Sequence, residues 1–474
     1  MNKISNKMKW SFALGGFAKD AMFAMSTIML FYFNVYLGVP SAFLGVMMLF
    51  VRVWDGINDP MMGTVVEQTK TRWGKFRPWI FIGTITNAIV LVIMFSNPGF
   101  ITDTTVKLIF VTVLYTLWGM TYTLMDIPFW SMIPTLSEDQ KEREGITIAT
   151  RLMTSIGYFV IAGGFFTLAK MLGGASDIES DIPNMLKGSF ILAIIVAVVF
   201  IICEIITVLN VKEQVKVIDE KKSLKDMLGL LKDNDQLLIV MIVVLVINFT
   251  LYVTSGMAIY YITYRIGNPD LYLPFIAAGG VAQVIGTVLY GPLKSKFTRK
   301  QIYNISIITQ LVSFVLLFIN AFFLSSNVAL LFVFAVPIFI GQGVFMVLQT
   351  VLLSDTVEYG ELKTGKRSEA VAFSVQTFVV KLAMGLSLAV IGIGLDVIGF
   401  IEPIKESELV STTFDQAEST LQGMNYIMFI LPILGLIIGQ YIFNKKHILN
   451  EEKYEEVMIA LKEKRGDVSG ENTI

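Results

Sequence analysis

Residues 188–210 read GSFILAIIVAVVFIICEIITVLN, a nearly continuous apolar run. At about 1.5 Å of rise per residue, a helix of about 20 apolar residues crosses the roughly 30 Å core of a bilayer. Lipid offers the backbone no hydrogen-bond partner, so such a segment must be helical. Of the 474 residues, 54% are hydrophobic and 16% are charged, whereas soluble domains carry about 25% charged residues. The sequence therefore predicts a membrane protein.

The chain contains twelve apolar segments of this kind, which predict an all-α membrane protein with twelve transmembrane helices. The first follows the basic start MNKISNKMKW and is too long for the core of a cleavable signal peptide. The expected helices cover residues 10–37, 41–63, 79–98, 106–134, 146–172, 188–210, 237–265, 273–293, 302–325, 329–353, 370–398 and 422–444.

The connections between these segments alternate in charge. TKTRWGKFRPW, SEDQKEREG and KSKFTRKQ are basic or mixed, whereas GVPSA and LSSNV contain neither Lys nor Arg. Because basic connections stay on the cytoplasmic side of a membrane, we expect both chain termini in the cytoplasm.

The longest polar connection inside the chain divides it into two six-helix halves. We expect an N-terminal half at 1–210, a central cytoplasmic loop at 211–236, a C-terminal half at 237–444 and a cytoplasmic tail at 445–474. Within the loop, KKSLKDMLGLLKDNDQ predicts an amphipathic helix on the inner membrane surface. In the tail, EEKYEEVMIALKEKRGD indicates a solvated polar helix. The halves resemble each other weakly, which is typical of secondary transporters.

Several charged residues lie inside the predicted helices, where each costs at least about 2.5–3.5 kcal/mol to insert. Four are basic and four are acidic, so the set is neutral and its members can pair. At their expected depths they can line one central cavity, which indicates a transporter that couples a small polar solute to a cation. The set consists of Lys19, Asp20, Arg52, Asp55, Asp59, Asp126, Arg151 and Lys381.

Asp55 and Asp59 are four residues apart and therefore share one face of a helix. Their carboxylates repel each other, and a cation between them relieves the repulsion. With oxygen atoms from Asn58 and Thr123, they form a candidate site for Na⁺, Li⁺ or H⁺, since hard cations prefer oxygen ligands. The alternative for Asp55 is a structural ion pair with Arg52, three residues away.

Asp126 and Trp130 are four residues apart, with Pro128 between them. A carboxylate beside an indole is typical of a sugar site, because the acid accepts hydrogen bonds from hydroxyls while the ring packs against C–H groups. Arg151 can donate to the same hydroxyls. The alternatives are an interfacial anchor for Trp130 and a snorkelling cation for Arg151.

Lys381 follows Gln376 and Thr377 by about one helical turn, and these two side chains can donate to a solute. We interpret Lys381 as a counter-charge to the aspartates, for which a bound cation would compete. Asp20, beside Lys19 in the first expected helix, is the charge that a structural role explains least well.

Other classes of function lack their signatures. The only cysteine, Cys203, lies in an apolar run and the only histidine, His447, in the polar tail, so a metal site, a haem site and a histidine proton relay are disfavoured. No phosphate-binding loop for ATP occurs, and no nucleophile–base pair indicates an enzyme. The net charge of −1 gives no nucleic-acid footprint. A membrane sensor that does not transport would not need the complete charge set.

RVWDGINDPMMG followed by TKTRWGKFRPW resembles the glycoside–pentoside–hexuronide cation symporter family. YTLWGMTYTLMDIPFWSMIPT, SVQTFVVK, KDNDQ and AIYYITYRIG extend the resemblance nearly end to end, and the chain is most similar to members that carry melibiose. The resemblance implies a major facilitator superfamily fold, alternating access and a place in a bacterial cytoplasmic membrane. It implies uptake of a galactoside or related glycoside, with a pentoside such as a xyloside, or a hexuronide, as the alternative.

The resemblance also assigns roles to matching positions. The positions implied for the coupling cation are Asp55, Asn58, Asp59 and Thr123, and those for the sugar are Lys19, Asp20, Asp126, Trp130, Arg151, Gln376, Thr377 and Lys381. One position departs from the pattern, because members that carry melibiose have tryptophan where Phe345 aligns. No cofactor is expected besides the coupling cation, and the partners are the sugar and the lipid bilayer around an expected monomer.

Overall fold

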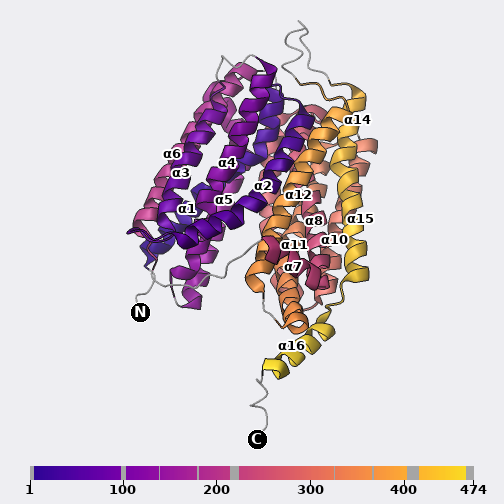
Figure 1. The fold of residues 1–474 in the computed structure, drawn as a ribbon. Helices are drawn as coiled ribbons and strands as arrows, with labels where there is room; N and C mark the ends of the chain where they lie inside the picture. Colours follow the sequence, from indigo (N-terminus) through magenta and orange to yellow (C-terminus); the bar gives the residue numbers. More distant parts are fainter. Residues whose placement is uncertain are drawn as a thin grey trace. The chain divides into compact units, whose positions relative to one another are not determined.

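The computed structural model describes residues 5–97, 103–137, 139–178, 181–213, 224–324, 326–365, 368–402 and 416–465. Within these ranges the chain is built of helices, and no strand is formed (Figure 1). Twelve of the helical segments found there are long and apolar enough to cross a membrane. The predicted all-α membrane fold is therefore confirmed, whereas the cytoplasmic position of the termini stays a prediction.

The helices follow the hydropathy of the sequence closely. Their bounds are α1 (Asn6–Phe31), α2 (Ser41–Gln68), α3 (Arg77–Phe95), α4 (Thr104–Met132), α5 (Gln140–Gly173), α6 (Ile182–Asn210), α7 (Leu224–Asp233), α8 (Asp235–Tyr260), α9 (Tyr272–Lys294), α10 (Arg299–Phe323), α11 (Val328–Thr364), α12 (Glu369–Val397), α14 (Glu418–Asn425), α15 (Leu431–Lys446) and α16 (Glu451–Arg465).

Three of the spans contain a wider π-helical turn. These turns are η1 (Tyr32–Tyr36) after α1, η3 (Tyr261–Arg265) after α8, and η5 (Tyr426–Ile430) between α14 and α15. Short 3₁₀ turns, η2 (Ile133–Thr135) and η4 (Pro269–Leu271), follow α4 and precede α9. Turns of the π type are frequent at functional sites.

Contacts between residues divide the chain into two compact units. Unit 1 comprises Met1–Lys221, Ala258–Ala277 and Leu388–Leu421, and unit 2 comprises Lys222–Met257, Ala278–Ser387 and Gln422–Ile474. The predicted domain boundaries of two six-helix halves remain a prediction.

In unit 1, α1 packs against α5 and α6, while α4 packs against α2 and α3. Small residues allow the close approach of these helices. A Cβ atom at Gly157 of α5 would lie 2.0 Å from the carbonyl oxygen of Phe17 in α1. The end of α8 belongs to the same unit, where the Tyr260 hydroxyl donates to Asn34 Oδ1 at 3.2 Å. Unit 1 therefore contains tightly packed helices around the charged positions of α1, α2 and α4.

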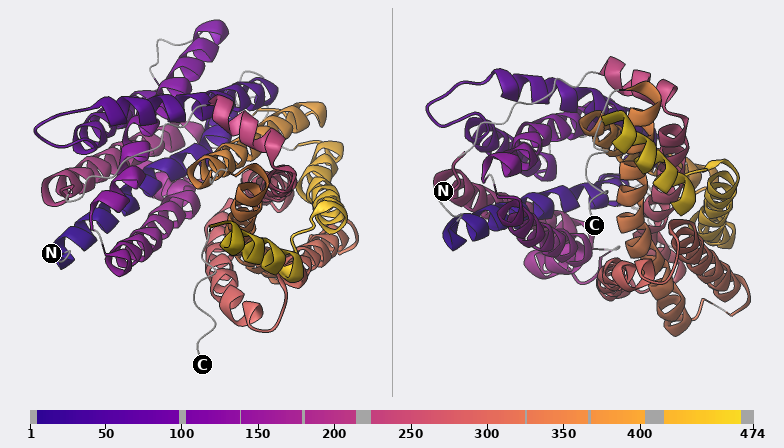
Figure 2. Two further views of the ribbon diagram at one scale, coloured as in Figure 1. Left: turned by 60° about the horizontal axis from the view of Figure 1, so that its bottom comes forward. Right: turned by 90° about the horizontal axis from the view of Figure 1, so that it is seen from below.

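In unit 2, α10 packs against α11 and α15, and α11 also contacts α16. In both views of Figure 2, α16 lies over the end of unit 2 that carries the C-terminal part of α11. Leu449, Val457 and Leu461 are buried there against Tyr359 and its neighbours. The prediction of a solvated tail helix is thus wrong for one face, because that face is apolar and packs on α11.

The central connection contains the predicted helix, α7. Its position on the inner membrane surface remains a prediction. The loop residues before it, 214–223, lie outside the described residues.

Candidate functional site

A buried lysine lies at the centre of the first group of charges in unit 1. The side chain of Lys19 on α1 is 4% exposed, and its Nζ donates to Asp20 Oδ1 at 2.6 Å and to Asp126 Oδ1 at 2.7 Å. A third contact joins Nζ to the Tyr122 hydroxyl at 3.2 Å. A lysine has three donor hydrogens, so this ammonium is fully engaged. We call these four residues the lysine cluster.

The indole ring of Trp130 lies beside the lysine cluster. The ring of Trp130 on α4 has its centroid 5.1 Å from Lys19 Nζ and 4.1 Å from the guanidinium carbon of Arg151. Both distances allow cation–π attraction. The carboxylates of Asp20 and Asp126 remain 24% and 22% exposed. The lysine cluster together with Trp130 and Arg151 therefore offers a polar solute partly exposed acceptors, cationic donors and an indole ring.

A second group of charges lies on α2. Arg52 Nη1 contacts Asp55 Oδ2 at 3.0 Å, and both side chains are almost fully buried. The structure thus shows the ion pair that was the predicted alternative for Asp55. The other oxygen, Asp55 Oδ1, is buried without a hydrogen-bond partner in the part of the chain that the structure describes. It faces Gly119 of α4, where a Cβ atom would lie 2.9 Å away.

Asp59 links α2 to α4. The Thr123 hydroxyl donates to Asp59 Oδ1 at 3.2 Å, and Asn58 is half-buried beside it in sequence. We call Arg52, Asp55, Asp59 and Thr123 the aspartate cluster. An unsatisfied carboxylate oxygen, a second carboxylate and a hydroxyl are the donor types that a hard monovalent cation prefers, and the cation site at these residues stays a prediction.

One turn of α4 connects the two clusters. Thr123 contacts Asp59, whereas Tyr122 and Asp126 contact Lys19. Residues three apart on a helix lie on the same side. A change in the position of this turn therefore reaches both clusters at once.

The predicted charges of unit 1 do not balance. The bases are Lys19, Arg52 and Arg151, whereas the acids are Asp20, Asp55, Asp59 and Asp126. Within this predicted set, four acids against three bases leave one negative charge in unit 1. The remaining base of the predicted set, Lys381, belongs to unit 2.

Three predicted sugar-site residues lie on α12 in unit 2. Thr377 is exposed and its hydroxyl donates to the Phe373 carbonyl at 3.1 Å, while Gln376 and Lys381 are half-buried. Phe345, the position that departs from the family pattern, is fully buried on α11, with its ring 6.1 Å from that of Tyr303. Phe345 therefore contributes to the packing of unit 2.

Sequence reasoning missed one acid. Glu204 on α6 is 1% exposed, and neither carboxyl oxygen has a hydrogen-bond partner among the described residues. Its Oε2 would lie 3.1 Å from a Cβ atom at Gly15, one turn before Lys19 on α1. The signal was available, because Glu204 is the one ionisable acid in the apolar run 188–210.

Comparisons with known proteins identify the family of the chain. A family model described as MFS/sugar transport protein matches residues 11–443. The lactose permease of Lactobacillus delbrueckii subsp. bulgaricus is 30% identical over 96% of this chain and 72% of its own length. The isoprimeverose transporter of Lactiplantibacillus pentosus is 27% identical over 92% of this chain and 87% of its own length.

A solved structure shares the fold. A bacterial homologue of the human lysosomal transporter Spinster superposes with a TM-score of 0.66 at 12% identity, over 96% of each chain. The implied major facilitator fold and the resemblance to the glycoside–pentoside–hexuronide symporters are confirmed, and the relatives are transporters, not enzymes. The chain is a multi-pass bacterial membrane protein and belongs to the MFS/sugar transport protein family.

Proposed function

We propose that this chain is a secondary active symporter that couples uptake of a galactoside or related glycoside to a monovalent cation. The observation that carries the proposal is the Lys19 ammonium shared between Asp20 and Asp126 beside the Trp130 ring. The family relationship supports sugar transport, and the buried Asp55 oxygen together with the Asp59–Thr123 contact supports coupling to a cation.

The lysine cluster has the chemistry for binding a sugar. Adjacent hydroxyls donate to the Asp126 and Asp20 carboxylates, taking positions that Lys19 now occupies. Hydrogen bonds to charged groups are the stronger ones. Trp130 packs on the apolar C–H face of the ring, while Lys19 and Arg151 donate to ring oxygens.

The aspartate cluster has the chemistry for binding Na⁺, Li⁺ or H⁺. Asp55 Oδ1, Asp59 and Thr123 supply oxygen ligands, with Asn58 as a further carbonyl donor. A bound cation holds α2 against α4 and thereby fixes the turn that carries Tyr122 and Asp126. Binding of either cargo raises the affinity for the other by the same factor, and we expect the empty or doubly loaded carrier to reorient.

The test is uptake of labelled melibiose and lactose into right-side-out membrane vesicles, with an imposed inward gradient of Na⁺, Li⁺ or H⁺. Accumulation above equilibrium with only one cation identifies that cation as the coupling ion. Equilibration without accumulation under every gradient would refute coupling. Absence of sugar flux under any condition would refute the galactoside proposal.

The second candidate substrate is a pentoside. It is favoured by the similarity to an isoprimeverose transporter over 92% of this chain. Xylosides and hexuronides therefore belong in the same vesicle experiment as alternative substrates.

A further inference from the structure

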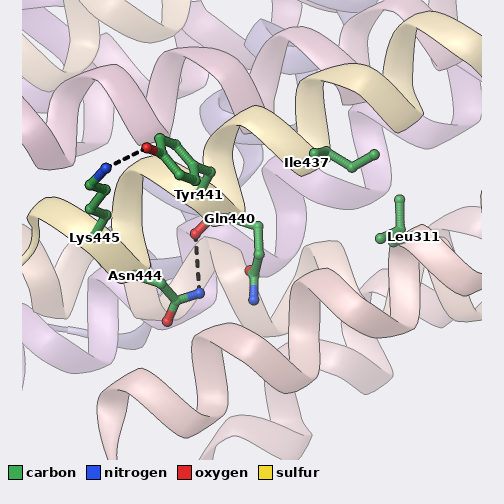
Figure 3. Close-up of a pocket in the computed structure, with 6 residues that line it drawn as sticks. All are labelled: Leu311, Ile437, Gln440, Tyr441, Asn444 and Lys445. Carbon is green, nitrogen blue, oxygen red and sulfur yellow. Dashed lines mark hydrogen bonds between the residues drawn. The ribbon is translucent and has the colours of Figure 1, made fainter.

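A groove lies between α10 and α15 in unit 2, and none of its lining residues belongs to either charged cluster. It has a volume of about 420 Å³. Figure 3 shows its lining, with Lys445 and Tyr441 toward one end and Leu311 toward the other. The lining residues are Leu311, Ile437, Gln440, Tyr441, Asn444 and Lys445.

The groove changes from polar to apolar along its length. Lys445 is the last residue but one of α15, whereas Ile437 lies about 12 Å further back along the helix at 1.5 Å per residue. Between them, Gln440 Nε2 and Asn444 Nδ2 donate to Asn304 Oδ1 of α10 at 2.8 and 3.0 Å. Leu311 lies about 10 Å deeper than Asn304 along α10. A phospholipid has the same order of parts: a charged phosphate, a polar ester region and apolar chains.

The polar end presents two donors to an anion. Lys445 Nζ donates to the Tyr441 hydroxyl at 2.7 Å, and both side chains are exposed. An ammonium has three donor hydrogens and a phenol has one. This contact uses one ammonium hydrogen and leaves the phenol hydrogen to donate to another acceptor. Lysine and a hydroxyl are suitable donors for a phosphate oxygen.

Exposed lysines lie near this end, and Glu451 and Asp355 are the acids beside them, both in contact with Arg299. Lys446 is exposed on the same turn, and Lys300 is exposed at the start of α10. Burial lowers the pKa of His447 to about 4, and the Lys300 and Arg299 charges act in the same direction, so His447 is neutral at pH 7. The two helices that form the groove also carry exposed apolar side chains, including Ile438 on α15 and Ile308 on α10, which suit contact with acyl chains.

We propose that this groove binds one anionic phospholipid, whose phosphate contacts Lys445 and Tyr441 and whose acyl chain lies along Ile437 and Leu311. By the distribution of basic connections, the lipid belongs to the cytoplasmic leaflet. The site is separate from sugar and cation binding and does not depend on the proposed function.

The test is native mass spectrometry of the purified full chain in detergent, titrated with phosphatidylglycerol or with phosphatidylcholine of the same acyl chains. Wild type is expected to bind one phosphatidylglycerol more tightly than further copies and more tightly than phosphatidylcholine. Lys445→Gln is expected to weaken that first binding step about tenfold, since it removes both a nearby charge and a direct donor. Tyr441→Phe should weaken it less.

Lys446→Gln is the matched control. It removes the same charge at the next residue, and the Lys446 side chain does not line the groove. Its effect is expected to stay within about twofold. Equal weakening by both substitutions would overturn the proposal in favour of general surface attraction. Displacement of the lipid by millimolar inorganic phosphate, or a dimer that forms in its place and depends on Tyr441, would overturn it as well.

Ile437→Trp gives a second, independent measurement, because it fills the apolar part of the groove and leaves Lys445 in place. Loss of the first lipid-binding step is expected. Binding at the wild-type affinity would show that the acyl chain does not lie there. A thermal melt in detergent confirms that each variant is folded.

Discussion

Replacing Asp126 with asparagine tests the role of the lysine cluster most directly. The change keeps the shape of the side chain but removes the charge that Lys19 contacts at 2.7 Å. Under the proposed function, the same carboxylate accepts a sugar hydroxyl. A hydrogen bond to a charged group contributes about 1.5–3 kcal/mol, and every 1.4 kcal/mol is about tenfold in affinity. Asp126→Asn is therefore expected to weaken sugar binding by about 10- to 150-fold.

The assay is equilibrium binding of a labelled galactoside to membranes at saturating sodium, measured by flow dialysis. Asp270→Asn is the matched control, since its carboxylate is 63% exposed and forms a surface contact of 3.5 Å with Lys170. Such surface pairs contribute about 0–1 kcal/mol, so the control should bind sugar as wild type does. A dissociation constant for Asp126→Asn within twofold of wild type would refute the reasoning.

Three further substitutions test the other contacts. Asp59→Cys is expected to abolish uphill sugar accumulation in vesicles but to retain sugar exchange, because the lysine cluster is untouched; sodium-driven accumulation by this variant would remove Asp59 from the cation site. Arg52→Gln leaves the buried Asp55 carboxylate unpaired, which costs about 3–5 kcal/mol, so its melting temperature in detergent should fall. The double variant R52Q/D55N should recover most of that loss, and no recovery would contradict the ion pair. Gly157→Val should abolish the folded peak in gel filtration, because a Cβ atom there would lie 2.0 Å from the Phe17 carbonyl; a wild-type yield would contradict this packing.

The sequence predicted the membrane spans because each needs a long apolar segment that is visible without knowledge of the fold. It predicted the ends less well. Hydropathy ended the tenth span at residue 353, whereas α11 continues to Thr364. The polar residues beyond the span remain helical, and the end of α11 packs against α16. Hydropathy reports where a helix leaves lipid, and it does not report where the helix ends.

The site residues stood out because charge is expensive inside a membrane. The sequence could not show which charged side chains on different helices form ion pairs. Spacing on α2 correctly offered Arg52 as a partner for Asp55, because both lie on one helix. Spacing alone cannot join α1 to α4, so the contact of Lys19 with Asp126 required the fold. Glu204 was overlooked although the same rule applies to it.

The position of Lys19 has a consequence for the return of the carrier. Its ammonium already fills acceptor positions of Asp20 and Asp126, so an unloaded carrier holds no naked carboxylate at this place. Under the proposed function, these contacts lower the electrostatic cost of moving the empty sugar site through the membrane. Because the ammonium is covalently attached to α1, it cannot dissociate and remains available to offset the charge of both carboxylates whenever the sugar site is empty.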